Sequence, residues 1–307
     1  MEAFSSIECF VRSAEVGSFA EAARRLSLTP AAVGKSVAKL EARLGVRLFQ
    51  RSTRSLTLTE AGQLFLGEVS ASLHTIQNAV ANLASAEGRP AGTLKVSMGT
   101  VFGRLYIVPL LGEFLRRFPA INPDWHFDNR QVDLIGQGFD AAIGGGFELP
   151  QGLVARKLTS AHRVLVASAE YLAGHEAIVE PDDLKHHDGI LIRSPQTGRV
   201  RSWQLTSRTR QHSPLTLKAR MTMSDSQAAC AAAAQGLGIA LVSMPFAVGY
   251  LDAETLQRVL PDWHVDDGNI SIYYAEHKLL PGKTRAFVDF IIEQFAEQGL
   301  GQRFSAL

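Results

Sequence analysis

The residues best suited to chemistry early in this 307-residue chain are lysines and arginines. Residues 1–60 hold nine of them against six acidic residues, whereas residues 61–307 hold 22 basic and 24 acidic ones. Cationic side chains gathered on one face can bind the phosphates of DNA, although a charge run alone is also typical of a solvated surface. The cations of most interest are Lys35, Lys39, Arg51 and Arg54.

The sequence has none of the common catalytic or metal-binding patterns. The adjacent histidines of His186-His187-Asp188 do not face one another on regular structure, so this run is predicted to be a surface loop. Gly236-Leu-Gly238 lacks the third glycine of a dinucleotide-binding loop. Cys9 and Cys230 indicate neither a disulfide framework nor a redox pair. We therefore predict a protein without enzymatic activity, metal or cofactor. Without a signal peptide or a membrane span, it is predicted to be cytoplasmic.

Three short helices are predicted to position the first cations. Ser18 and Thr29 can each cap a helix, and Pro30 suits a first helical position because its missing N–H costs nothing there. Gly17 and Gly45 can end helices in the left-handed conformation. The predicted helices cover residues 4–16, 19–26 and 30–44.

The third predicted helix has two faces of different character. Its apolar residues recur at spacings of three and four and are predicted to pack on the first two helices: Val33, Val37, Leu40 and Leu44. Lys35 and Lys39 lie on the opposite face. Two short helices joined by a tight turn let the second helix enter the major groove of double-stranded DNA. We therefore expect Thr29, Pro30 and Ala31 to contact bases.

A β-hairpin is predicted after the third helix. Leu56 and Leu58 alternate as in a strand, while Arg51 and Arg54 lie at a basic tip. A wing of this kind places arginines over phosphates or in the minor groove. The helices and hairpin in this order favour DNA binding over a merely solvated surface.

Residues 17–62 resemble the winged helix-turn-helix of the LysR-type transcriptional regulators. They read GSFAEAARRLSLTPAAVGKSVAKLEARLGVRLFQRSTRSLTLTEAG and contain that family's AA-x-x-L, LE-x-x-LG-x-x-LF-x-R and LT-x-AG. The resemblance implies a DNA-binding domain over residues 1–58, with the helix-turn-helix at 19–38, and a sequence-specific transcriptional regulator. Gly34 departs from the family, which usually has serine there, and costs the helix about 1 kcal/mol relative to alanine.

Residues 59–88 are predicted to form a linker helix that joins two copies of the chain. Thr59 can cap this helix. Its apolar residues follow a heptad seam: Leu66, Val69, Leu73, Ile76, Val80 and Leu83. Packing on its own chain is the alternative interpretation. A helix pair between subunits is favoured because two-fold symmetric DNA sites require a homodimer, and the family resemblance implies a homotetramer.

From Thr93 onward, predicted strands alternate with helices, which indicates an α/β fold. The strand candidates are residues 94–98, 125–128, 140–144, 163–167, 189–192, 239–242 and 270–274, and the clearest helices are 104–117, 225–235 and 282–298. Sheets of this class bind ligands beyond the carboxyl ends of their strands, where helix N-termini gather.

This region is similar to the effector domain of the LysR-type family, which has the two-lobed fold of periplasmic binding proteins. The matching segments are FGRLYIVPLLGEFLRRFP, VDLIGQGFDAAIG, VLVASAEYLA, GLGIALVSMP and LLPGKTRAFVDFIIEQF. The resemblance implies a domain over residues 92–300, with lobe one at 92–161 plus 268–300 and lobe two at 162–267. A small-molecule effector of unidentified chemistry is expected between the lobes.

The effector contacts implied by position in the family are Thr100, Asp128, Asp225 and Ser226. Thr100 and Asp225 also suit helix caps, and Asp128 can bond its own loop. Where the family commonly has an arginine, this chain has Gly144, which predicts a smaller and less positive cleft wall.

Two other classes of function stay open at this point. A solute-binding protein or an α/β enzyme would bind its ligand, or turn it over, without residues 1–88. The basic wing and the lack of catalytic groups argue against it. A nonspecific architectural DNA binder would have no use for the domain at residues 92–300.

Overall fold

The computed structural model describes residues 2–51, 56–84, 90–146, 148–276 and 280–307, without the side chains of residues 2, 3, 51, 71, 74, 75 and 77–84. The chain forms two compact units. The first is Met1–Gly92 with Asp133–Phe139, and the second is Thr93–Val132 with Asp140–Leu307. Within the described residues, every helix is too short or too polar to traverse a bilayer.

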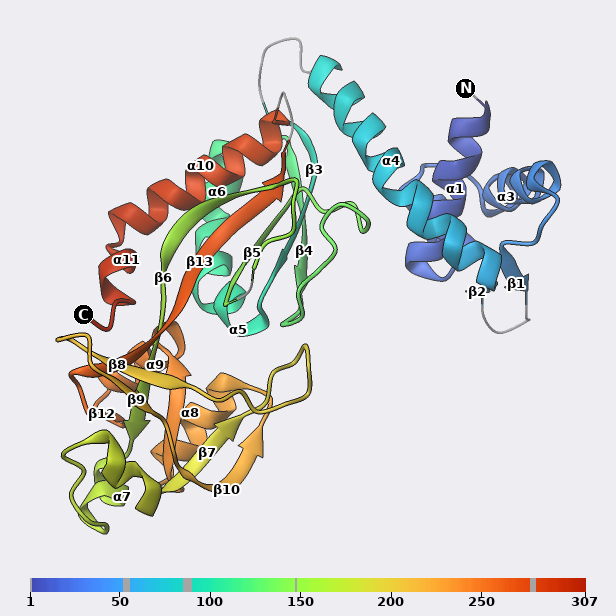
Figure 1. Ribbon diagram of the computed structural model, residues 1–307. Helices are drawn as coiled ribbons and strands as arrows, with labels where there is room; N and C mark the ends of the chain where they lie inside the picture. The colour runs from blue at the N-terminus through green and yellow to red at the C-terminus, as the bar shows by residue number, and fades with distance from the viewer. Residues whose placement is uncertain (1, 52–55, 85–89, 147, 277–279) are drawn as a thin grey trace. The chain divides into compact units, whose positions relative to one another are not determined.

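The first unit contains the predicted helices and wing (Figure 1). Its elements are α1 (Glu2–Val16), α2 (Phe19–Arg25), α3 (Pro30–Leu44), β1 (Phe49–Arg51), β2 (Leu56–Leu58) and α4 (Glu60–Ala84). Ser18 Oγ accepts from the Glu21 amide at 3.4 Å, and Thr29 Oγ1 accepts from the Ala32 amide at 3.2 Å. Gly45 ends α3 at φ 72°. These contacts confirm the predicted caps.

The name head is used below for α1 to α3 with the β1–β2 hairpin. Its core forms where α3 packs on α1 and α2. Val33 and Val37 are fully buried, and the rings of Phe10 and Phe49 lie 5.3 Å apart. Leu44, however, is 41% exposed, so its predicted inward position is wrong. It is the last residue of α3 and lies beyond Leu40, the last leucine of the helix that the core buries.

Helix α4 begins at the predicted cap, since Thr59 Oγ1 accepts from the Gly62 amide at 3.0 Å. Leu66 and Val69 pack against the head core and Leu73 is 4% exposed, whereas Ile76 is 47% exposed. The first half of the apolar seam is therefore covered by its own chain. The side chains of Val80 and Leu83 lie outside the described residues.

The second unit is built on a mixed sheet with the strand order β10-β7-β11-β6-β13-β5-β3-β4. β3 is parallel to β5, and β7 is parallel to β10 and β11, while β6 is antiparallel to β11 and β13. The strands are β3 (Gly92–Met98), β4 (Ile121–Phe127), β5 (Ala141–Gly145), β6 (Leu153–Ala167), β7 (Asp188–Ile192), β8 (Gln204–Ser207), β9 (His212–Pro214), β10 (Lys218–Met223), β11 (Ile239–Ser243), β12 (Gln257–Val259) and β13 (Trp263–Ala275). The predicted α/β class is confirmed.

Two long strands, β6 and β13, run through both predicted lobes, which are called the halves of this unit below (Figure 1). The predicted lobe boundaries, at residues 161/162 and 267/268, fall inside them. The β13–β6 pairing has a register shift between Asp266 and Asn269, so β13 carries a bulge at this level. The sequence predicted only the most apolar part of each strand. Strand β10, whose side chains are mostly exposed, was not predicted.

The helices of the second unit are α5 (Thr100–Phe102), α6 (Leu111–Arg117), α7 (Ala169–Ala173), α8 (Ser226–Ala234), α9 (Met244–Asp252), α10 (Gly282–Glu297) and α11 (Leu300–Arg303). The prediction of one continuous helix over 104–117 is wrong. Gly103–Ile107 forms a π-helical turn and Val108–Leu110 a 3₁₀ turn before α6 begins. Pro109 explains the break, because it has no N–H to continue the α-helical ladder.

The segment His186-His187-Asp188 is not a surface loop, which corrects the sequence prediction. His187 is 2% exposed, and Asp188 begins β7. Burial lowers the pKa of His187, so this imidazole is neutral at physiological pH. Among the described residues, no group of three or more His, Cys, Asp or Glu is placed to hold a metal ion.

A buried ion pair ties α10 to the sheet. Lys283 Nζ lies 2.8 Å from Asp140 Oδ2, and the two side chains are 3% and 2% exposed. Asp140 Oδ2 also accepts from the Lys95 amide at 2.9 Å. The pair therefore joins α10 to β3 and to the residue that precedes β5.

Candidate DNA-binding surface and ligand cavity

The N-terminal end of α3 is open to solvent. Thr29, Pro30 and Ala31 are all exposed at the position where the Thr29 cap turns the chain into the helix. The turn from α2 is tight. Ser27 adopts a left-handed φ of 54°, and the Leu28 amide donates to Ala23 O at 2.9 Å. The first turn of α3 is therefore accessible from solvent, as a helix that enters the major groove requires.

The cations on α3 form one exposed row. Lys35 and Lys39 are exposed, and so is Arg43, four residues further on, so the row extends one turn beyond the predicted pair. Among the described residues, no atom other than those of the chain neighbours and the α3 backbone lies within 4 Å of a Cβ built on Gly34, next to this row. The side chain of Arg51 and all of Arg54 lie outside the described residues.

A buried carboxylate joins α3 to the wing, and sequence analysis did not single it out. Glu41 is 7% exposed, and its Oε1 accepts from the Leu48 amide at 2.8 Å and from the Phe49 amide at 3.1 Å. Because these amides belong to the first residue of β1 and to the residue before it, Glu41 helps to set the position of the hairpin relative to α3. The signal available in the sequence was the Leu40-Glu41 pair of the family motif.

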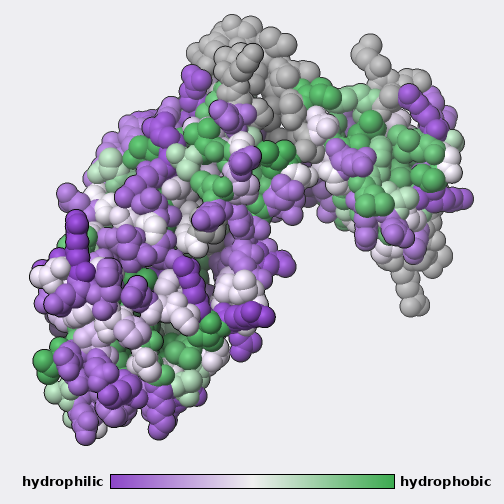
Figure 2. Space-filling model, in the orientation of Figure 1, coloured by the Kyte–Doolittle hydropathy of each residue, from purple (hydrophilic) through white to green (hydrophobic). Residues whose placement is uncertain are grey.

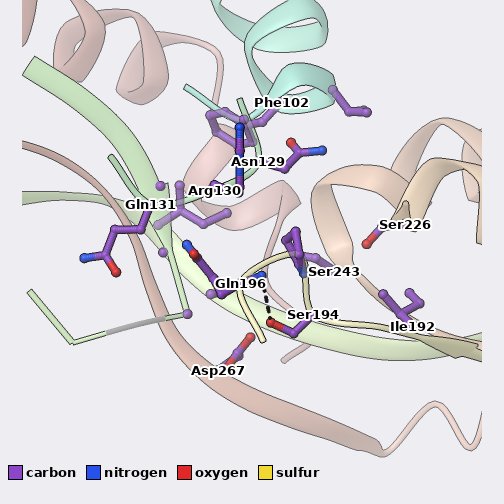
Figure 3. A pocket seen from close by; sticks show the side chains of 18 of the residues that line it. Phe102, Asn129, Arg130, Gln131, Ile192, Ser194, Gln196, Ser226, Ser243 and Asp267 are labelled. Carbon is purple, nitrogen blue, oxygen red and sulfur yellow. Dashed lines mark hydrogen bonds between the residues drawn. The ribbon is translucent and has the colours of Figure 1, made fainter. Parts of the chain in front are cut away.

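The second unit contains a cavity of about 310 Å³. It lies beyond the carboxyl ends of β3, β5 and β7, where such sheets commonly bind ligands. Figure 3 shows side chains entering it from both halves of the unit, with Asn129 and Arg130 on one side and Ser194, Gln196 and Ser226 on the other. The face of the molecule seen in Figure 2 is largely hydrophilic, with smaller groups of hydrophobic residues.

Three of the four predicted effector residues line this cavity: Asp128, Asp225 and Ser226. Thr100 does not line it, and its amide donates instead to Asn129 Oδ1 at 3.0 Å. Asp225 caps α8, since its Oδ1 accepts from the Ala228 amide at 2.7 Å. Asp128 binds Arg130 through the backbone amide and the guanidinium, and these contacts lower the pKa of the carboxyl.

A charged cluster in the cavity wall was not predicted. Asp267 is bound by Arg163 Nε at 2.9 Å and by Arg201 Nη1 at 3.0 Å. Both guanidinium carbons lie over the ring of Trp203, 4.6 and 4.3 Å from its centroid. The cavity therefore contains arginines even though the family arginine is replaced by Gly144. No local pattern reveals the cluster, because its members come from three separate segments.

Glycines let β5 and β13 come close enough to form this wall. A Cβ on Gly145 would lie 2.1 Å from Asn269 O, and one on Gly146 would lie 3.0 Å from Asp267 Oδ2. Gly146 also has a left-handed φ of 77°. Larger residues at these positions would displace the bulge that carries Asp267.

An apolar wall completes the cavity. Phe102 and Ile270 are buried, and Phe246 is half-buried. Tyr273 also lines the cavity, and burial raises its pKa to about 12, so its phenol stays neutral at physiological pH. The cavity thus combines aromatic surface with ionised groups at its polar end.

Comparison with known proteins assigns both parts of the chain. Residues 87–296 match the LysR substrate binding domain, and residues 4–63 match the bacterial regulatory helix-turn-helix protein, lysR family. The chain belongs to the LysR family of transcriptional regulators. Its head is the DNA-binding helix-turn-helix of the family, and its second unit is the effector-binding domain.

Similar regulators share this architecture over almost their whole length. PtxR, a transcriptional regulator from Pseudomonas aeruginosa, is 29% identical over 94% of this chain and 92% of its own. A transcriptional repressor from Pseudomonas aeruginosa strain UCBPP-PA14 is 32% identical over 97% and 93%. The solved structure of AphB, the Vibrio cholerae virulence activator, has a TM-score of 0.58 at 26% identity over 94% and 98%. A repressor and an activator therefore both resemble this LysR-type regulator.

Proposed function

We propose that this LysR-type regulator binds a two-fold symmetric DNA site as a dimer, with one α3 in each of two major grooves. Thr29, Pro30 and Ala31 contact bases. The observation that carries the proposal is that these residues are exposed at the end of a helix whose opposite face buries Val33, Val37 and Leu40. The phosphates are held by Lys35, Lys39, Arg51 and Arg54.

We propose that dimerisation uses the second half of α4. Ile76 exposes 47% of its surface on this helix, and Val80 and Leu83 continue its spacing. Because Leu66, Val69 and Leu73 already pack on the head, they support the position of the helix and contribute less to a subunit contact. A homotetramer requires further contacts between effector domains.

A small molecule in the cavity is proposed to control DNA binding. Asp128, Asp225 and Ser226 lie where the two halves of the unit meet the cavity, so a ligand there would favour one relative position of the halves over another. The protein then acts in the cytoplasm as a regulator and catalyses no reaction.

Fluorescence anisotropy tests the proposal, using the full chain and DNA from its own upstream region, with scrambled competitor and a salt series. Four phosphate-binding cations per subunit predict a slope of about −7 for log K against log salt in a dimer. Equal binding to scrambled DNA would contradict sequence-specific recognition. Absence of binding at low salt would refute the proposed function.

Two variants separate base contacts from phosphate contacts. Arg51→Ala with Arg54→Ala should weaken binding to all sequences and reduce the slope by about 3–4. Ala31→Asp should abolish binding by placing a carboxylate at the groove, while an acidic residue in the first turn does not destabilise α3. Ala169→Asp puts the same charge in the first turn of α7 and serves as the control. Full affinity in Ala31→Asp would remove α3 from the interface.

A further inference from the structure

The cavity carries an excess of positive charge, which bears on the chemistry of its ligand. Among the described residues that line it, Arg130, Arg163, Arg193 and Arg201 stand against three aspartates. Each aspartate already has partners. Asp128 binds Arg130, Asp225 caps α8, and Asp267 is shared by Arg163 and Arg201. A cationic ligand would have to break one of these contacts to reach a carboxylate.

Of the two arginines that bind Asp267, Arg201 is the more accessible. Its side chain is 58% exposed, compared with 22% for Arg163 and 5% for Asp267. The described contacts engage Nη1 with Asp267 Oδ1 and place the guanidinium over Trp203. A guanidinium has five N–H donors in a planar fork, so Arg201 retains N–H groups that can donate hydrogen bonds to a second carboxylate.

Asp267 and Trp203 hold Arg201 and Arg163 in place. Asp267 lies at the bulge of β13, opposite β6, and bulges commonly redirect a side chain toward a site. The Asp267 carboxylate and the Trp203 ring keep the two guanidiniums together, which like charges in water would not favour. Because Asp267 and Trp203 supply this order, a ligand anion does not have to organise its own binding site.

Part of the cavity suits an apolar ligand body. Phe102, Phe246 and Ile270 supply its wall, and Tyr273 remains neutral. We propose that the effector is a small anion with an apolar body, whose charged group binds Arg201 beside Asp267. This inference rests on the proposed function, because it takes the cavity to be the effector site.

Three probes of the same shape test the inference by calorimetry on the full chain: cyclohexanecarboxylate, cyclohexanecarboxamide and cyclohexylmethylammonium. They differ chiefly in charge. The carboxylate should bind at least about tenfold tighter than the carboxamide, since hydrogen bonds to an ionised partner are roughly twice as strong as neutral ones. The ammonium should bind most weakly.

Variants test whether Arg201 causes the preference for the carboxylate over the carboxamide. Arg201→Met should remove the advantage of the carboxylate over the carboxamide, and Arg201→Lys should keep part of it because the charge remains. Arg199→Met is the matched control, since Arg199 is an exposed arginine of the same segment that does not line the cavity. Equal affinities for carboxylate and carboxamide, an unchanged preference in Arg201→Met, or no carboxylate binding at millimolar concentration would each overturn the inference.

DNA anisotropy on the same samples separates this inference from the proposed function. Normal operator binding without an anion preference would refute only the inference. An anion preference without operator binding would support the inference as a property of the cavity and refute the proposed function.

Discussion

Replacing Glu41 by alanine should weaken the attachment of the wing to α3. Glu41 Oε1 accepts from the amides of Leu48 and Phe49, and these two residues are 1% and 2% exposed. The alanine variant leaves both donors buried without an acceptor. The hairpin start then loses its hydrogen bonds to α3 and keeps only its apolar packing, so DNA affinity should fall together with stability.

The size of the effect follows from the two lost contacts. A buried donor without a partner costs about 1–3 kcal/mol, so the free energy of unfolding of the head should fall by about 2–6 kcal/mol. An m-value of about 1 kcal/mol/M converts this into a urea midpoint lower by at least about 2 M. Glu41→Gln keeps the oxygen and loses only the charge assistance, so its cost should be about 1 kcal/mol.

The assay needs two spectroscopic signals because the tryptophans report on one unit only. Trp125, Trp203 and Trp263 all lie in the second unit, whereas far-ultraviolet circular dichroism also reports the helices of the head. The dichroism midpoint of Glu41→Ala should fall while the tryptophan transition stays in place. Glu68→Ala, at an exposed glutamate of α4, is the control. An unchanged dichroism midpoint, or equal movement of both signals, would refute this account of Glu41.

Three further predictions concern other parts of the chain. Lys283→Met should cost about 3–5 kcal/mol in urea unfolding followed by tryptophan fluorescence, because it leaves the Asp140 charge buried, and adding Asp140→Asn should recover more than half of that loss. Burial, followed by the charge of His264, lowers the pKa of His162 in the folded protein. As the pH falls, this imidazole therefore takes up a proton in the unfolded chain at a higher pH than in the folded protein. Stability of the second unit should therefore be complete above pH about 6.5 and fall toward pH 5, with a shallower fall in His162→Asn when urea midpoints are compared across that range. Ile76→Glu should convert a dimer into monomers in sedimentation equilibrium. The control Gln63→Glu, outside the apolar stripe of the same helix, should leave the dimer intact. An intact Ile76→Glu dimer would exclude this part of α4 from the subunit contact.

Local features of this protein were readable from the sequence because each depends on neighbouring residues. A cap such as Thr29 needs an acceptor three residues before a free amide, and Gly45 needs only a left-handed φ after the last helical residue. The family resemblance rests on the same short-range spacing. Prediction failed where a local signal was overridden, as at Leu44, which has the periodicity of a core residue but ends its helix in solvent.

The polar end of the cavity was decided by tertiary structure alone. Arg163 and Asp267 meet because β6 and β13 pair across most of their length and a bulge directs Asp267 toward the cavity. Arg201 and Trp203 join them from the segment before β8. Segments this far apart leave no periodic pattern in the chain, and the charges of Arg163 and Asp267 compensate one another only once the strands are in register. The sequence by itself determined that this is a DNA-binding regulator with a ligand domain. The charge that its ligand must carry depends on which side chains the fold brings together.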